Sequence, residues 1–190
     1  MRLRKKASWL VCGLSVFVAA AATYAQKGAE TFTATAATTA AGGAKASAPV
    51  TITIDRKTPA SEAERLVAAF NSGGAAALRK ALVGVAPTGS VRLGGGKATP
   101  ARLAIERTTD KGRLLTVVTD QPIMFLGAGV PSAKPKEGYD FAVLDLEVDA
   151  SGKGTGTFAP AAKITVKQGA FVVEDYSAEL VRLTDISKSK

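Results

Sequence analysis

Alternation of apolar and polar residues is the strongest pattern in this chain, and a period of two residues predicts β-strands. The alternation is clear in residues 50–54 (VTITI) and clearest in 139–149 (YDFAVLDLEVD). Shorter runs lie in 89–93, in 101–119, which reads as a hairpin around the turn DKG, and in 156–186. The pattern therefore predicts one strand followed, further along the chain, by a meander of about six antiparallel strands.

Between these strands the period changes to that of helices. Ser61 and Glu64 have the spacing of a capping box, and the apolar residues that follow in AERLVAAF lie on one helical face. Residues 71–74 (NSGG) predict an end, and Leu78 and Leu82 predict a second short helix. Because helices and strands are segregated, we expect an α+β fold in which an N-terminal strand and two short helices pack on the meander, as a curved sheet or half-barrel.

The segments outside the alternating region predict the domain boundaries. Residues 26–49 are rich in Ala, Thr and Gly with one large side chain, so they are predicted to be a flexible linker. Residues 50–187 are predicted to form a single globular domain, and 188–190 a polar tail.

The first 25 residues have the layout of a secretory signal peptide, with four basic residues, an apolar run over 9–22 and small residues at 23 and 25. An uncleaved membrane anchor is the alternative, but the apolar run is shorter than the roughly 20 residues that a spanning helix needs. The sequence thus predicts an exported protein, periplasmic or secreted, that meets the membrane only through its signal peptide during export.

Removal of residues 1–25 changes the composition that matters for chemistry. The only cysteine, Cys12, lies there with four of the 25 basic residues, so the formal charge falls from +9 to +5, and the chain has no histidine. These absences argue against histidine-based acid–base catalysis, zinc sites, thiol chemistry and disulfides. The chain has no dense basic cluster with interleaved aromatic residues, so the sequence does not predict nucleic-acid binding. We expect a monomer without cofactor or metal.

The string VDASGKGTGTF, residues 148–158, invites two functional interpretations. A phosphate-binding loop would require a different glycine spacing and a following helix, whereas the segment after it alternates like a strand. A calcium loop would place Lys153 and Pro160 where oxygen ligands belong. A hairpin turn is the better prediction.

The long connection that begins with DQPIMF, over residues 120–141, is the most distinctive local feature. Its apolar residues plug the core in one interpretation, and form a lip over a ligand pocket in the other. In the second interpretation the candidate ligand-binding residues are Asp120, Tyr139 and Asp140. A carboxylate-based hydrolase would need a pair of acidic side chains, and four acids lie at predicted strand ends or connections. The candidates for that pair are Asp120, Asp140, Glu174 and Asp175.

Several segments in residues 50–186 resemble segments of known proteins in their residues and in their order along the chain. They are TIDR, AERLVAAF, GRLLTVVTDQPIMF, DFAVLDLEVDASGKGTG and the closing EDY and VRL. In these segments the chain resembles a family of uncharacterised exported bacterial proteins. The resemblance implies an exported single-domain protein and brings with it no activity, cofactor or catalytic residue.

Three functional hypotheses follow from the sequence. The first is a non-enzymatic binding domain, periplasmic or secreted, for a small molecule or a protein partner. The second is a structural protein associated with the cell envelope, and the third is the carboxylate-based hydrolase.

Overall fold

The structure is a computed structural model that describes residues 28–39, 43, 45–125, 137–167, 170–175 and 181–189. The predicted signal peptide, residues 1–25, lies outside the described residues, as does 126–136 of the long connection. The elements in chain order are β1 (Glu30–Thr39), β2 (Lys45–Ile54), α1 (Ala60–Val83), β3 (Gly89–Leu93), β4 (Thr99–Thr109), β5 (Gly112–Thr119), β6 (Phe141–Val148), β7 (Gly154–Lys167), β8 (Ala170–Asp175) and β9 (Val181–Lys188).

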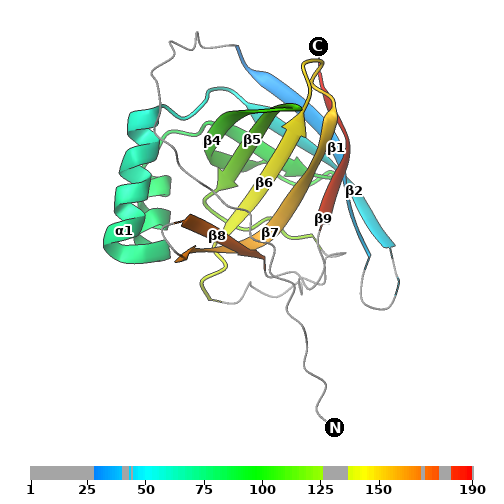
Figure 1. The fold of residues 1–190 in the computed structure, drawn as a ribbon. Helices are drawn as coiled ribbons and strands as arrows, with labels where there is room; N and C mark the ends of the chain where they lie inside the picture. The colour runs from blue at the N-terminus through cyan, green and yellow to red at the C-terminus, as the bar shows by residue number, and fades with distance from the viewer. Residues whose placement is uncertain are drawn as a thin grey trace.

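The strands close into a barrel (Figure 1). Strands β1 to β7 pair in chain order, and β9 joins β7 to β1, so eight antiparallel strands form a ring. Strand β8 lies outside this ring and pairs with the far half of β7. The antiparallel α+β prediction is confirmed, but the half-barrel of about six strands is wrong, because β1 and β9 complete the ring and leave it without open edges.

The predicted linker is the main correction. Residues 30–39 form β1 and residues 45–49 begin β2, so the domain starts well before residue 50. Phe32, Ala34 and Ala36 are buried inside the barrel while threonines alternate with them. Alanine buries little area by itself, and it packs well here because large side chains from the other walls of a closed barrel meet it.

The barrel interior is the main hydrophobic core. The inward-facing apolar residues of the predicted strand 139–149 are confirmed, since Ala142, Leu144, Leu146 and Val148 are all fully buried. Phe32, Phe125 and Phe158 are the largest side chains of this core. The interior of an eight-stranded barrel is either filled by side chains or holds one small ligand. In this barrel, the buried apolar side chains of the described strands pack against one another in one cluster.

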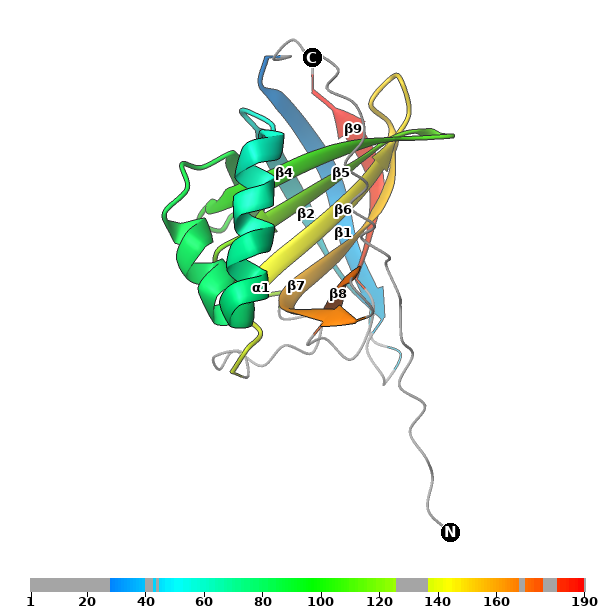
Figure 2. The ribbon, with the colours of Figure 1, turned by 60° about the vertical axis from the view of Figure 1, so that its left-hand side comes forward.

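Helix α1 packs outside the barrel, against the outer faces of β4, β5, β6 and β7 (Figure 2). Its buried residues are Leu66, Phe70, Leu78 and Leu82, which are the apolar positions that the helical period predicts. The structure has one helical element where two were predicted, and its backbone leaves the helical conformation at Gly73 and Gly74, where the first helix was expected to end. The predicted capping box is wrong, because the helix begins at Ala60 after Pro59 and no side chain caps it.

The C-terminal boundary also differs from the prediction. Lys188 was assigned to a polar tail, but it ends β9 and its ammonium group binds Glu30 of β1. Among the described residues, no helix combines the length and the apolar character needed to cross a membrane.

Candidate functional site at the recess end of the barrel

The two ends of the barrel differ in their connections and in their charges. One end holds the β4–β5 and β6–β7 hairpins, the start of β1 and the end of β9, and we call it the ionic end (Figure 1). The other end holds the connections from β1 to β2 and from β5 to β6, and we call it the recess end. The β4–β5 turn spans residues 110–111, whereas the β5–β6 connection spans 120–140.

At the ionic end, Glu30 is bound by two cations. Arg113 donates from Nη1 and Nη2 to the two Glu30 carboxylate oxygens, at 2.9 and 3.1 Å, and Lys188 donates from Nζ at 2.7 Å. The Glu30 side chain is 4% exposed. Burial by itself raises the pKa of Glu30, but the hydrogen bonds and charges of Arg113 and Lys188 outweigh it and lower the pKa to about 2.

The network extends through Glu106 to the segment before α1. Arg113 donates to Glu106 at 2.9 Å, and Lys57 binds the same carboxylate oxygen at 2.5 Å. Burial tends to raise the pKa of Glu106, while Lys57 and Arg113 lower it further than burial raises it. The Arg113 guanidinium also lies 5.8 Å from the centre of the Phe32 ring, within the range of a cation–π contact. These charged side chains thus link several strands to one another at this end of the apolar core.

The glycine-lysine string forms the hairpin between β6 and β7, which confirms the predicted turn. Asp149 Oδ1 accepts hydrogen bonds from the Ser151 amide and hydroxyl and from the Lys153 amide, at 2.8, 2.7 and 3.0 Å. The Ser151 hydroxyl and then the Lys153 amide lower the pKa of Asp149. Gly152 has φ of +79°, which glycine adopts without strain. The carboxylate therefore organises the turn.

At the recess end, a recess of about 420 Å³ lies beside the β1–β2 ribbon and β9. It is lined by Ala37, Thr38, Thr39, Lys45, Ala46, Ser47 and Arg182. Sequence reasoning missed it, because most of these residues fell in the predicted linker. The period-two alternation of TFTATAATT was the signal that could have found it.

The strand register explains why the surface is hollowed here. Residues paired directly across antiparallel strands point to the same side of the sheet, and the inward positions of β1 are the even-numbered ones. Ala37 is paired with Ser47 on one side and Arg182 on the other, so all three face outward. Lys45 is paired with Thr39 in the next outward row. A floor of short side chains on β1 thus lies between the long side chains of β2 and β9.

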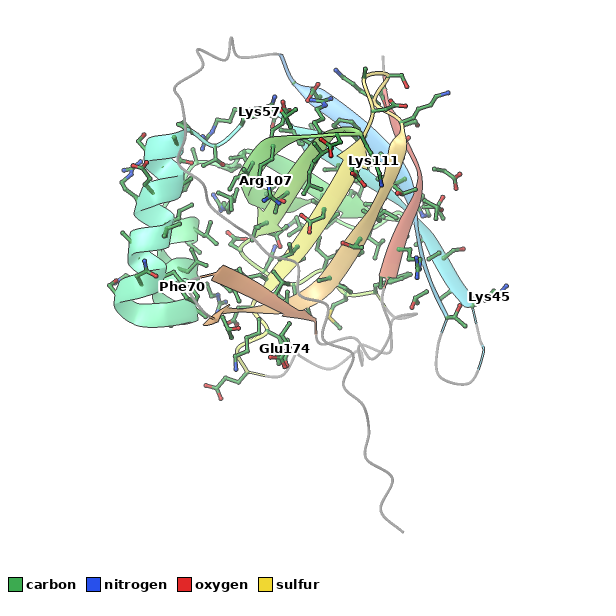
Figure 3. The ribbon with its side chains drawn as sticks, in the orientation of Figure 1. Lys45, Lys57, Phe70, Arg107, Lys111 and Glu174 are labelled. Atoms are coloured by element: carbon green, nitrogen blue, oxygen red, sulfur yellow. The ribbon has the colours of Figure 1, made fainter. Side chains whose placement is uncertain are left out.

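The two cations at the recess have no ion-pair partner in the part of the chain that the structure describes, unlike Arg113 and Lys188 at the ionic end. Lys45 and Arg182 are both exposed, and Lys45 lies at the start of β2 and points away from the barrel (Figure 3). Thr38 faces the interior side, is 5% exposed, and its hydroxyl has no hydrogen-bond partner among the described residues.

The candidate residues Asp120, Tyr139 and Asp140 lie at the neighbouring ends of β5 and β6, but each carboxylate is bound by a different arginine. Asp120 accepts from Arg102 Nε at 2.8 Å, and Asp140 accepts from Arg79 of α1 at 3.3 Å. The Tyr139 hydroxyl donates to Glu174 of β8. Two ion pairs and one hydrogen bond thus tie these three residues to three different elements.

The apolar residues of DQPIMF fill the core. Ile123 and Phe125 are buried among the residues inside the barrel, and the Ile123 amide donates to the Pro160 carbonyl at 2.8 Å. Only Met124 of that apolar run is exposed. This arrangement agrees with the plug interpretation of the segment.

One further carboxylate has an altered pKa. Asp145 lies on the outer face of β6, in the same cross-strand row as Thr116, Thr157 and Arg182. Burial raises its pKa, while the Thr116 hydroxyl, which donates at 2.6 Å, and the charge of Arg107 oppose that rise. Figure 3 shows Arg107 in front of the strands β4 and β5.

No three residues of the described chain with carboxylate, thiol or imidazole side chains lie close enough together to hold a metal ion. A comparison with protein-family models, curated proteins and solved structures found no match to this chain.

Proposed function

We propose that this protein is an exported, non-enzymatic binding domain, periplasmic or secreted, whose ligand is a small molecule held in the recess beside β1. One observation carries the proposal. The recess gathers two exposed cations, which have no ion-pair partner among the described residues, over a floor of short side chains at the end of the barrel opposite the ionic network. A binding site of this kind keeps its polar groups free for the ligand.

The surroundings of the acidic residues in the hydrolase hypothesis support a non-enzymatic function. A general acid and a general base must be free to exchange protons with a substrate. Asp120 and Asp140 are instead bound by Arg102 and Arg79. The structural hypothesis remains the alternative, and the experiment below separates it from binding.

A thermal-shift screen of the purified protein against metabolites, cell-wall fragments and metal ions tests the proposal. A ligand that binds the native state raises the apparent stability. We expect one chemical class to raise the melting temperature of the natural protein and of Thr155→Trp, and to have no effect on Ser47→Trp. Both substitutions place an indole at an exposed hydroxyl position on a strand, and only Ser47 lines the recess.

Two results would overturn the proposal. A shift that survives in Ser47→Trp would place the ligand elsewhere on the molecule. The absence of a shift across the whole panel would favour the structural, envelope-associated role.

A further inference from the structure

The chemistry of the recess indicates which class of ligand it takes. We infer that it selects a small anion, with a carboxylate or phosphate group held between Lys45 and Arg182. This inference rests on the proposed function, because it names the ligand class for the same site.

The first argument for an anionic ligand is the position of the two cations. Lys45 is on β2 and Arg182 is on β9, one strand to either side of β1 and two residues apart along it. With strands about 4.8 Å apart and a rise of about 3.4 Å per residue, their Cα atoms are about 12 Å apart. The two long side chains can therefore reach one anionic group from opposite sides of the recess.

The second argument is the chemistry of the other residues that line the recess. Every described residue that lines the recess is neutral or basic, so none of them offers a carboxylate that would compete with an anionic ligand. Ser47 and Thr39 share the outward rows with the two cations and supply hydroxyl donors. Arginine forms paired hydrogen bonds with carboxylate and phosphate groups, while lysine acts as a point charge.

The third argument is the contrast with the cations that form ion pairs within the fold. Arg113 and Lys188 neutralise buried Glu30, and Arg102 neutralises Asp120, so these positive charges are used within the fold. Lys45 and Arg182 have no such role in the described part of the chain. Exposed cations gathered around a hollow raise the local concentration of anions.

The test is a ¹H–¹⁵N NMR titration of the purified protein at constant ionic strength, with inorganic phosphate, succinate and neutral succinamide as probes. Succinate and succinamide are similar in size and differ in charge. We expect succinate or phosphate to shift the amide signals of residues 37–39, 45–47 and 182 in a saturable way, and succinamide to leave them unchanged. Comparison of the phosphate and succinate titrations identifies which acid group is preferred.

Substitutions locate the effect. Lys45→Met and Arg182→Met should each weaken anion binding about tenfold, because each removes a charged hydrogen-bond donor. Arg92→Met is the matched control, since Arg92 is an exposed cation on β3 that does not line the recess, and affinity should stay within about twofold.

Each other outcome has a definite meaning. Equal binding of succinate and succinamide at the recess would overturn the anion inference and leave the proposed function standing. Equal losses in all three variants would overturn it as well, because they would reveal non-specific attraction to a basic surface. If no probe moves the recess signals while a neutral compound from the thermal-shift screen does, the anion inference fails alone. If nothing in either experiment binds, both proposals fail.

Discussion

The two ends of this barrel use similar residues in opposite ways. At the ionic end, Arg113 and Lys188 surround the buried carboxylate of Glu30, and the three groups connect β5, β9 and β1. At the recess end, Lys45 and Arg182 face solvent across a hollow. Figure 3 shows Lys45 at one end of the molecule, and Lys57 and Lys111 at the other.

The comparison separates charges that stabilise the fold from charges that are available to a ligand. Removal of one partner from a buried ion pair leaves an uncompensated charge in a poorly solvated site and costs much stability. Removal of an exposed, unpaired cation costs almost none. Stability and binding experiments should therefore give opposite results at the two ends.

The largest effect is expected for Glu30→Gln. The glutamine leaves Arg113 and Lys188 without the carboxylate that neutralises them, so the free energy of unfolding at pH 7 should fall by about 3 kcal/mol. Urea unfolding measures this change. A loss well below 1 kcal/mol would mean that the ionic end does not hold the barrel closed.

The same variant tests how the free energy of unfolding depends on acidic pH. The pKa of Glu30 is lowered from 4.5 to about 2 in the fold, so its stabilising contribution is complete above pH 4.5 and is lost as the pH falls toward 2. The stability difference between the natural protein and Glu30→Gln should therefore shrink across that window. A difference that stays constant from pH 5 to pH 2 would contradict the assigned pairing.

A smaller effect of opposite sign is expected at the recess end. Thr38 buries a hydroxyl without a partner in the described residues, and an unsatisfied buried hydroxyl costs about 1–3 kcal/mol. Thr38→Val keeps the shape and removes this group, so it should raise the free energy of unfolding by about 1 kcal/mol. Thr39→Val, at an exposed neighbouring position, should change it little. Destabilisation by Thr38→Val would show that the hydroxyl is hydrogen-bonded in solution.

A further prediction concerns Asp145, a carboxylate on the outer face of β6 between the two ends of the barrel. Because burial raises its pKa, the folded protein disfavours its charged form, and that cost grows as the pH rises above the unfolded value of 3.8. Asp145→Asn retains an oxygen to accept the Thr116 hydroxyl and should stabilise the protein at pH 7 and have no such effect at pH 3. Melting temperatures at the two values measure this. A gain at pH 3 equal to that at pH 7 would exclude ionisation as the cause.

The smallest effects are expected for Lys45→Met and Arg182→Met on stability. Both side chains are exposed and make no ion pair in the described chain, so each should change the free energy of unfolding by less than about 0.5 kcal/mol. Urea unfolding at low and high salt measures this. A loss comparable to that of Glu30→Gln would erase the distinction between the two ends.

Sequence reasoning located the strands with large side chains and missed the one with small ones. The buried positions in 50–54 and 141–148, and the buried leucines of α1, follow directly from periodicity. Strand β1 also alternates, but its inward residues beyond Phe32 are Ala34, Ala36 and Thr38, which are small. The burial of such side chains is favourable only when other walls of the barrel meet them. The recess was missed with it, because most of its residues are on β1 and the start of β2.

The sequence by itself determined the strand periodicity, the helical segment with its break at Gly73 and Gly74, the hairpin turn at Asp149, and the absence of histidine. These are local properties, set by side-chain spacing and backbone preferences within a few residues. Only the tertiary structure decided that the sheet closes into a ring and that Glu30 meets Lys188 across 158 positions of the chain. It also decided that Lys45 and Arg182 flank one recess. Such pairings depend on strand register around a closed barrel, which no local pattern encodes.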